Sequence, residues 1–314
     1  MQLARQSSNP ILITGSHRSG TSWVGRILAL SPRLGLIYEP FNLRSHIRRR
    51  NGCSAAFPYW FTYMPTGLAE QYEQPLRDTL HFRYDLFAQL KLARSSYEIV
   101  DCLRYFLFFL NHRIRGQTPL MKDPIAVLSS EWLAETFHMK VVALIRHPAA
   151  FASSLKQAGW THPFHDFLEQ SKLMDEYLEG YRSDIETFAR YEQDIVDQAA
   201  LLWVILHTVL YKYLDRNPGW YLTRYGDLSR DPVRVFEEIF NFIDVPYNES
   251  LQAAVWASSR KGEKLPKGLH PSFQRDSQAN TKRWKERLSQ DEIRRVRNRV
   301  EPLSSRFYQE SDWR

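Results

Sequence analysis

Residues 15–22, with the sequence GSHRSGTS, have the spacing of a phosphate-binding loop, in which four residues separate two glycines. The loop follows the short apolar run of residues 10–14, which predicts a buried strand. It precedes residues 23–30, whose apolar side chains fall on one face of a helix. A strand, a glycine-bearing loop and a helix in this order can bind phosphate at the start of the helix. For this motif alone, an ordinary turn rich in glycine and serine is the alternative.

The loop differs from that of kinases and ATPases at one position that matters for chemistry. Where those proteins have the lysine that neutralises the terminal phosphates, this chain has Thr21, which argues against ordinary phosphoryl transfer. Arg18 supplies a positive charge from within the loop instead. Backbone N–H groups at the start of the helix can still hold a phosphate-like group. The residues expected to provide them are Ser19, Gly20, Thr21 and Ser22.

A second motif, VVALIRHPAAFASSL, lies far downstream and combines an arginine with a serine. Arg146 follows the apolar run of residues 140–145, and Ser154 stands eight residues after Arg146. A guanidinium can hold two phosphate oxygens, and a hydroxyl near the start of the next helix adds a third contact. Taken alone, Arg146 is also consistent with a salt-bridged residue at the end of a strand.

Together the two motifs resemble those of the sulfotransferases that use 3′-phosphoadenosine 5′-phosphosulfate (PAPS). The resemblance covers about residues 10–285. It implies that the first loop binds the 5′-phosphosulfate and that Arg146 and Ser154 bind the 3′-phosphate, which distinguishes PAPS from ATP. It also implies that PAPS is the co-substrate and that no metal ion is required.

Three further positions match the family. Glu39, in YEPF, stands where tyrosylprotein and carbohydrate sulfotransferases carry a glutamate similar in role to a general base. Lys122, in MKDP, resembles the lysine that steadies the charge on the transferring group. Tyr225, in TRYGDL, resembles the tyrosine near the adenine, although Gly226 stands where that segment usually has glutamate. The resemblance therefore implies catalytic roles for Glu39, Arg18 and Lys122.

Ordinary structural roles are alternatives for several of these residues. Glu39 could cap a helix or pair with the basic run Arg48–Arg50, and Lys122 could be a solvated loop charge. The segment RDSQANTKRW, residues 275–284, resembles the late basic loop that folds over PAPS, with a solvated loop as the alternative. The candidate cofactor-binding residues in this segment are Ser277 and Lys282.

Two histidines lie next to the motif arginines, but we do not assign them a catalytic role. His17 precedes Arg18, and His147 follows Arg146. Cytosolic small-molecule sulfotransferases use a histidine two residues after the lysine that corresponds to Lys122, where this chain has Pro124. This departure from their pattern favours Glu39 as the base.

The candidate residues share one relation to the expected secondary structure, because each lies at or just beyond the end of a predicted strand. In an open parallel sheet the carboxyl ends of the strands share one edge, where ligands bind. The sequence therefore predicts an α/β fold with an open, mainly parallel sheet flanked by helices, similar to that of P-loop NTPases. The residues expected to converge at this edge are Arg18, Glu39, Lys122, Arg146 and Tyr225.

The chain is expected to form a single domain over residues 1–314. Two helical or irregular insertions are expected at about residues 41–118 and 159–195. The region of about residues 247–314 is expected to contain a lid-like loop and a helix.

Composition excludes several classes of protein. With 43% hydrophobic and 25% charged residues, the chain is neither disordered nor collagenous. A net charge of +7, from 42 basic and 35 acidic residues, favours anionic partners. Two cysteines without nearby metal-ligand spacing imply neither a disulfide framework nor a zinc site. The N-terminus has no signal-peptide pattern and the densest apolar run is too short to span a membrane, so we expect a cytoplasmic protein.

These observations favour a sulfotransferase that moves a sulfuryl group from PAPS to an acceptor hydroxyl. The acceptor is expected to be a glycan, with tyrosyl or phenolic and lipid hydroxyls as alternatives, and residues 57–64 and 159–190 are expected to line its site. One rival is a magnesium-dependent kinase with an altered loop. Another is a non-enzymatic polyanion-binding protein that uses Arg48–Arg50 and arginines 294, 295, 297 and 299, although no nucleic acid is expected as a partner.

Overall fold

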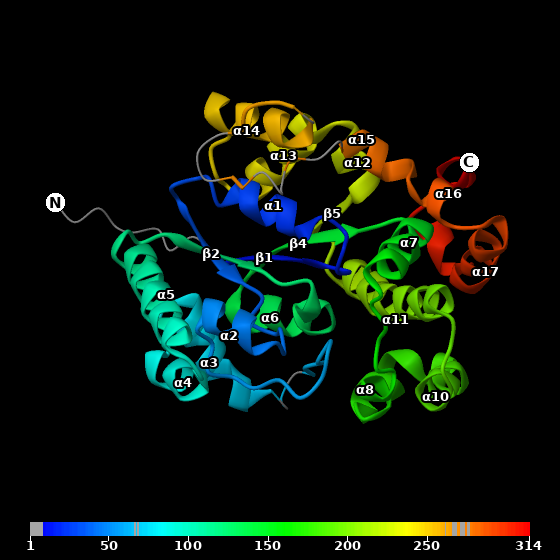
Figure 1. The fold of residues 1–314 in the computed structure, drawn as a ribbon, viewed down its shortest axis with the longest axis horizontal. Helices are drawn as coiled ribbons and strands as arrows, with labels where there is room; N and C mark the ends of the chain where they lie inside the picture. Colours follow the sequence, from blue (N-terminus) through cyan, green and yellow to red (C-terminus); the bar gives the residue numbers. More distant parts are fainter. Residues whose placement is uncertain are drawn as a thin grey trace. The chain divides into compact units, whose positions relative to one another are not determined.

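The computed structural model of the 314-residue chain describes residues 9–65, 67, 69–260, 262–265, 269, 270, 274 and 277–314. The first eight residues, and Arg275 and Asp276 of the late basic segment, lie outside this part of the chain. Strands and helices alternate along the described chain (Figure 1). The strands are β1 (Ile11–Gly15), β2 (Leu34–Tyr38), β3 (Thr118–Lys122), β4 (Lys140–Ile145) and β5 (Tyr221–Arg224).

The helices fall into three stretches of the sequence. The first stretch comprises α1 (Thr21–Leu28), α2 (Ser45–Asn51), α3 (Glu70–Leu80), α4 (Leu86–Leu92), α5 (Ser96–Ile114), η1 (Ile125–Ser129) and α6 (Ser130–Phe137). The second comprises α7 (Pro148–Ala158), α8 (His165–Leu168), α9 (Ser171–Leu173), η2 (Met174–Leu178), η3 (Glu179–Tyr181), α10 (Arg182–Arg190) and α11 (Ile195–Arg216). The third comprises α12 (Tyr225–Arg230), α13 (Pro232–Phe242), α14 (Glu249–Ser259), α15 (Ser277–Lys282), α16 (Trp284–Arg287), α17 (Gln290–Val300), η5 (Leu303–Arg306) and α18 (Glu310–Trp313).

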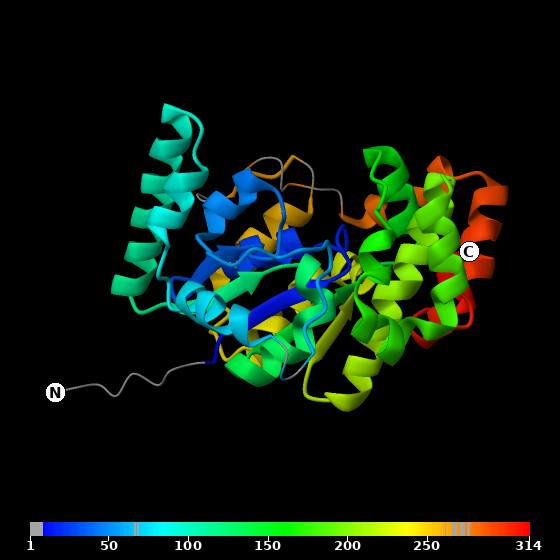
Figure 2. The same cartoon turned by 90° about the horizontal axis from the view of Figure 1, so that it is seen from below.

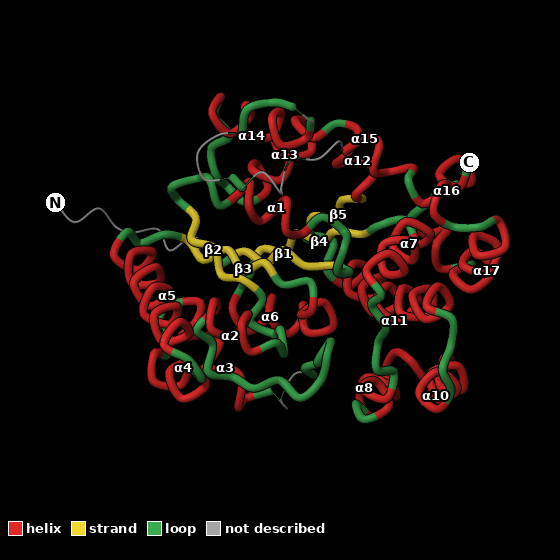
Figure 3. Tube along the Cα trace, viewed as in Figure 1, coloured by secondary structure: helices red, strands yellow, loops and turns green. Residues whose placement is uncertain are grey.

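The five strands form an open sheet in the order β2-β3-β1-β4-β5. Both β1 and β2 run parallel to β3, and Leu120 of β3 lies opposite Ile11 and Leu36. Strands β2, β3 and β1 lie side by side (Figure 3). Strands β1 and β4 are apolar along almost their whole length and buried on both faces, as strands covered by helices on either side must be. The sheet and its flanking helices confirm the predicted α/β class.

The described chain divides into two compact units, each built from several segments. Unit 1 consists of Met1–Thr14, Thr21–Val142 and Ile239–Leu251, and unit 2 of Gly15–Gly20, Ala143–Glu238 and Gln252–Arg314. The single domain expected over residues 1–314 stays a prediction.

In unit 1, helices from the expected insertion at residues 41–118 form a layer of their own. Helix α5 packs against α2 and α4, and α4 in turn lies close to α2 (Figures 1 and 2). Cys102 and Phe109 of α5 are buried within this layer. Tyr84 anchors it, because its hydroxyl donates to the Arg49 carbonyl at 2.6 Å. Helices α2, α4 and α5 of this segment therefore pack together within unit 1.

In unit 2, helix α11 is the central helix, and both α7 and α17 pack against it (Figure 1). It is long and apolar enough, by length and composition, to cross a membrane, and it is the one described helix that passes this test. However, 67% of its most apolar window is buried inside the protein. Its apolar composition is thus explained by its place in the core.

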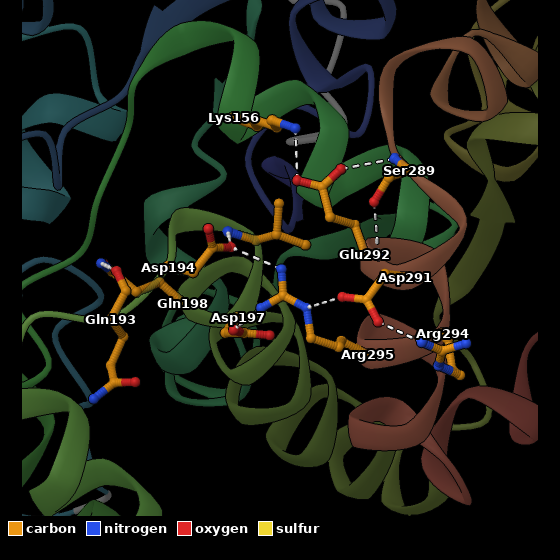
Figure 4. Close-up of polar contacts among 11 residues, drawn as sticks. Lys156, Gln193, Asp194, Asp197, Gln198, Ser289, Asp291, Glu292, Arg294 and Arg295 are labelled. Carbon is orange, nitrogen blue, oxygen red and sulfur yellow. Dashed lines mark hydrogen bonds and ion pairs between the residues drawn. The ribbon is translucent and has the colours of Figure 1, made fainter.

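Ion pairs connect helix α17 to α7 and α11 (Figure 4). Its first residues form a capping box, in which Ser289 and Glu292 satisfy each other's backbone N–H groups. Glu292 also accepts from the Lys156 ammonium of α7 at 2.6 Å. Arg295 pairs with Asp197 of α11, and it lies 3.4 Å from Asp194 and 3.3 Å from Asp291. These pairs fix the C-terminal helix within unit 2.

The four C-terminal arginines suggested as a polyanion-binding strip each have a carboxylate partner. Arg294 and Arg295 pair with aspartates, as Figure 4 shows. Arg297 pairs with Glu310, and Arg299 lies 3.0 Å from Asp184. Because these cations are neutralised within unit 2, the structure argues against the polyanion-binding alternative for this helix.

Within the region of about residues 247–314, where a lid-like loop and a helix are expected, the segment before residue 284 is partly helical. Helix α14 buries one face through Leu251, Ala254, Val255 and Ser258. This spacing has the period of a helix, but two of its four positions carry small residues, so the apolar signal is weak in the sequence. Residues 277–282 form α15 where the resemblance implied a loop.

Gly15, at the end of β1, allows β4 to approach closely in unit 2. Its φ is +123°, and an added Cβ would lie 1.9 Å from the Leu144 carbonyl oxygen. We therefore expect Gly15→Ala to lower the free energy of unfolding by at least about 3 kcal/mol. Urea unfolding measures this loss. Gly180→Ala, where an added Cβ meets nothing within 4 Å, is the matched control and should change stability little. Equal stability of the two variants would contradict the prediction.

Candidate functional site

In unit 1, the parallel register of β2 and β3 places Glu39 beside Lys122. Tyr38 lies opposite Lys122, and the Glu39 N–H donates to the Lys122 carbonyl at 2.9 Å. The Lys122 ammonium donates to Glu39 Oε1, and the Asn42 amide donates to Oε2 at 2.6 Å. Both carboxylate oxygens are therefore held before any ligand binds. We call Glu39, Asn42, Lys122 and Asp123 the Glu39 cluster.

Lys122 is a buried residue of the Glu39 cluster and not a solvated loop charge. Its relative exposure is 1%, and its ammonium lies 3.8 Å from the centre of the Tyr38 ring. Gly25 of α1 leaves room for its side chain, because a Cβ there would lie 2.9 Å from Lys122 Cγ. The ammonium therefore has a fixed place beside the Glu39 carboxylate.

The backbone of Glu39 is held in the left-handed region, with φ at 50°. This conformation is unfavourable for a residue with a side chain and persists only where its surroundings fix it. The Glu39 carbonyl accepts from the Asn51 amide at 2.8 Å and from the Asn42 N–H at 3.1 Å. Among the described side chains, the ionic partner of Glu39 is Lys122. Arg49 of the basic run pairs instead with Glu98 at 2.8 Å.

Asp123 is a member of the Glu39 cluster that the sequence did not single out. Its Oδ2 accepts from the Phe41 N–H at 2.7 Å, and its Oδ1 accepts from the Ile125 N–H at 2.9 Å. These bonds shape the turn that follows Glu39. Burial, helped by the negative charge of Glu39, raises the pKa of Asp123 to about 7. The feature of the sequence that could have identified Asp123 is its place directly after Lys122 in the KDP segment.

In unit 2, Arg18 links the two motifs that the sequence identified. The Arg18 guanidinium donates to Ser154 Oγ at 2.8 Å. The backbone carbonyl of Arg18 accepts from Arg146 Nη1 at 2.7 Å. The φ of Arg18 is 65°, and its guanidinium lies 5.2 Å from the Trp160 ring centre. We call Arg18, Arg146, Ser154 and Tyr225 the Arg18 cluster. Residues more than 120 positions apart thus meet in this cluster.

Tyr225 packs against both the phosphate loop and Arg146. The Arg146 guanidinium lies 4.9 Å from the Tyr225 ring centre. Gly20 has φ at +97°, and a Cβ there would lie 2.9 Å from the Tyr225 ring. The residue after Tyr225 is Gly226, so the acidic side chain that the family usually has at this position is absent. The next residue, Asp227, pairs with Arg224 at 2.6 Å and with Arg230 at 2.8 Å.

A pocket of about 470 Å³ opens beside Arg146 and lies entirely within unit 2. We call it the Arg146 pocket. Its lining is mainly basic and aromatic, with one carboxylate, that of Asp312, which lies 3.4 Å from Arg224. The basic residues are Arg146, Arg224, Arg230, Lys282, Lys285 and Arg314, and the aromatic ones are His147, Tyr225, Trp284 and Tyr308. Such a lining suits a ligand that carries both a ring and negative charge.

His147 belongs to the wall of the Arg146 pocket. Its ring stacks on Trp284 at 5.1 Å and meets Tyr308 edge to face. Burial, together with the charges of Lys285 and Arg146, lowers the pKa of His147 to about 3. His17 is half-buried, and desolvation together with the charge of Arg18 lowers its pKa to about 3. Both imidazoles are therefore neutral at pH 7 and serve as packing groups.

The remaining candidates occupy different places. Lys282 is exposed and lines the Arg146 pocket, whereas Ser277 is buried and donates to the Ser229 carbonyl at 3.0 Å. The Ser19 N–H and hydroxyl both donate to the Ser16 carbonyl, within the loop. Ser16 Oγ is buried and has no hydrogen-bond partner in the described part of the chain. Thr21 and Ser22 begin helix α1 in unit 1.

The fold and these residues define an α/β transferase of the phosphate-loop type. A family model described as the Sulfotransferase family matches residues 10–249, so the chain belongs to the sulfotransferase family. It is therefore a sulfotransferase enzyme, and PAPS dependence is typical of this family. No curated protein sequence was found to match the chain.

Solved sulfotransferase structures are similar to this chain at low identity. The sulfotransferase domain from the curacin biosynthetic pathway is 16% identical, with a TM-score of 0.50, and the match covers 94% of this chain and 97% of that one. The sulfotransferase domain of the Synechococcus PCC 7002 olefin synthase is 16% identical, with a TM-score of 0.47 and coverage of 95% and 97%. Sulfotransferase STF9 from Mycobacterium avium is 15% identical, with a TM-score of 0.46 and coverage of 97% and 78%. At such identity, the first of these similarities shows the fold alone.

The described residues contain no group of three or more His, Cys, Asp or Glu side chains that could hold a metal ion. Sulfuryl transfer without a metal stays a prediction for this protein. Cys53 and Cys102 are both buried and unbridged.

Proposed function

We propose that the protein transfers a sulfuryl group from PAPS to a hydroxyl group of a carbohydrate. The observation that best supports this donor is the Arg146 pocket, which combines cations and aromatic rings next to the Arg18 cluster in unit 2. In this proposal Arg146 and Lys282 bind the 3′-phosphate, and the adenine packs against Tyr225 or Trp284. Ser154 supports this site indirectly, because its hydroxyl orients Arg18.

The phosphate loop would receive the 5′-phosphosulfate. Ser16 Oγ, buried and without a bond to another described residue, is suitably placed within the loop to donate to an oxygen of that group. Ser19 already uses its N–H inside the loop, at 3.3 Å from the Ser16 carbonyl, so the remaining N–H groups of Gly20, Thr21 and Ser22 carry this role.

The Glu39 cluster would carry out the proton transfer. The acceptor oxygen forms a bond to sulfur while the bond between sulfur and the bridging phosphate oxygen breaks, and adenosine 3′,5′-bisphosphate leaves with that electron pair. Glu39 takes the hydroxyl proton. A carboxylate offers about four lone-pair sites. Lys122 and Asn42 use two of them, so Glu39 can still accept from a hydroxyl. Lys122 and Arg18 balance the charge on the leaving oxygens.

A carbohydrate acceptor is supported by half-buried aromatic residues in unit 1. In the aromatic segment of residues 57–64, Phe57 is buried between Phe41 and Tyr72, with ring centres 4.1 and 5.3 Å away. Trp60 is half-buried, and the exposed Arg44 lies 6.0 Å from its ring centre. A ring face next to a cation suits a sugar that carries negative charge. Tyrosyl, phenolic and lipid hydroxyls remain alternatives for the same chemistry.

The donor is tested by calorimetric titration without magnesium, using adenosine 3′,5′-bisphosphate and ADP in separate experiments. We expect binding of the bisphosphate at least about tenfold tighter than that of ADP, because only the former carries a 3′-phosphate for Arg146. Equal affinity for the two nucleotides would contradict the 3′-phosphate site. The ADP titration is then repeated with magnesium. Binding of ADP only in the presence of magnesium would favour the kinase alternative.

We expect Arg146→Ala to weaken bisphosphate binding by about 10- to 100-fold, the usual loss for a hydrogen bond to a charged group. Affinity for ADP should change much less. Arg190→Ala, which removes an exposed arginine of α10 in the same unit, is the matched control and should bind normally. If Arg146→Ala binds the bisphosphate as well as the unaltered protein, the assignment of Arg146 is wrong.

A further inference from the structure

Helix α5 of unit 1 has two apolar faces, and only one of them is covered within the described structure. The inner face, which includes Cys102 and Phe109, is buried against its own unit. The outer face carries a second row of large apolar side chains, which we call the α5 stripe. Its members are Ile99, Val100, Leu103, Leu107, Leu110 and Ile114, and their exposed fractions range from 36% to 70%.

The α5 stripe is a continuous surface and not a scatter of exposed residues. From Val100 to Ile114 its members recur at alternating steps of three and four residues, which places them within an arc of about 100° at 3.6 residues per turn. Helix α4, which packs against α5, also exposes Phe87, at 80%, and Leu92, at 38%. Single exposed apolar residues are ordinary, but a contiguous patch of this size marks an interaction site.

Basic residues border the α5 stripe on both sides. At 100° per residue, Arg113 lies along one edge, and Arg104 and Arg115 lie along the other. All three are exposed, as are Lys91 and Arg94 near the junction of α4 and α5. Both acidic residues of α5 are half-buried, and of the two only Asp101 offsets part of the charge of a bordering arginine, that of Arg104. Glu98 pairs with Arg49 at 2.8 Å, and Asp101 lies 3.9 Å from Arg104.

We propose that this face of unit 1 binds the surface of a membrane that carries anionic phospholipids. Helix α5 would lie in the plane of the interface, with the α5 stripe among the acyl chains and the bordering arginines at the phosphates. Charge complementarity favours this partner over a second copy of the chain, since two such faces would bring their arginines together. If the protein is cytoplasmic, as the sequence predicts, it meets the leaflet that carries anionic lipids.

The proposal is tested by sedimenting the full-length protein with vesicles of phosphatidylcholine alone and of phosphatidylcholine with 30% phosphatidylserine. We expect binding to the anionic vesicles, at least about tenfold weaker binding to the neutral ones, and a marked decrease in 0.5 M salt. L103Q/L107Q should reduce binding to the anionic vesicles by about tenfold or more, since it removes two inserted side chains. Arg113→Gln should reduce it about fivefold.

Tyr191→Gln is the matched control, because it removes an exposed aromatic residue of unit 2, at 65% exposure, and should bind vesicles normally. Bisphosphate binding by L103Q/L107Q should match that of the unaltered protein, which shows that the variant is folded. No sedimentation with anionic vesicles would overturn the proposal. So would a dimer in light scattering that L103Q/L107Q converts to a monomer, since a second copy would then cover the α5 stripe.

Discussion

The Glu39→Gln variant is expected to lose sulfuryl transfer by about 10²- to 10⁴-fold, while its affinity for adenosine 3′,5′-bisphosphate stays within about twofold. Glutamine keeps the size of the side chain but cannot take the proton of the acceptor hydroxyl. The nucleotide contacts proposed above belong to the Arg18 cluster and the Arg146 pocket, so binding of the desulfated nucleotide should be retained. Initial rates with PAPS and a panel of sugar acceptors, together with calorimetry, measure the two effects.

The variant also needs a test of its structure, because Lys122 and Asn42 both donate to the Glu39 carboxylate. An amide has one acceptor oxygen, so one of these donors loses its partner and some stability is lost. Glu98→Gln is a suitable control, since it neutralises another ion-paired glutamate of unit 1. Loss of activity in Glu39→Gln alone, at a temperature where both variants are folded, identifies the base. A fully active Glu39→Gln protein would exclude this role.

The strands and the residues at their ends were accessible from the sequence because both depend on local patterns. The apolar runs that became β1 and β4 are buried on both faces, so their composition alone identifies them. A parallel strand also fixes where the next residue lies. Glu39 directly follows β2, and Arg146 directly follows β4. The order of the strands came from the structure, since it depends on pairings between distant segments.

Which side chains bond to each other could not be predicted from local patterns. The bond between Arg18 and Ser154 joins residues 136 positions apart, and that between Lys122 and Glu39 joins residues 83 positions apart. Asp123 was missed because its function is to hold backbone N–H groups, which no spacing in the sequence reveals. The α5 stripe was also missed, since an apolar helix pattern does not show which of two apolar faces is covered.

The protein is expected to lose stability as the pH falls below 6, because the folded structure keeps four histidines of unit 2 in the neutral form. Burial lowers the pKa of His17, His147 and His162 from 6.5 to about 3, and that of His207 to about 4. Between these values and 6.5 the unfolded chain binds more protons, so this stabilisation is complete above pH 6.5 and is lost as the pH falls. In unit 1, Asp123 has the opposite effect, because its raised pKa makes the folded state bind one proton more than the unfolded state between about pH 7 and pH 3.8.

The net difference of about three protons predicts that the free energy of unfolding falls by about 4 kcal/mol per pH unit between pH 6 and 4. Urea unfolding at several pH values measures this slope. His207→Phe should keep a ring stacked on Trp203 and reduce the slope by about 1.4 kcal/mol per pH unit, because one titrating group is removed. His46→Gln, at an exposed position of α2, is the matched control. A slope that is the same in all three proteins would show that these buried histidines do not control acid stability. A lower stability of His207→Phe at pH 8 would report only altered packing, since packing shifts the whole curve without changing its slope.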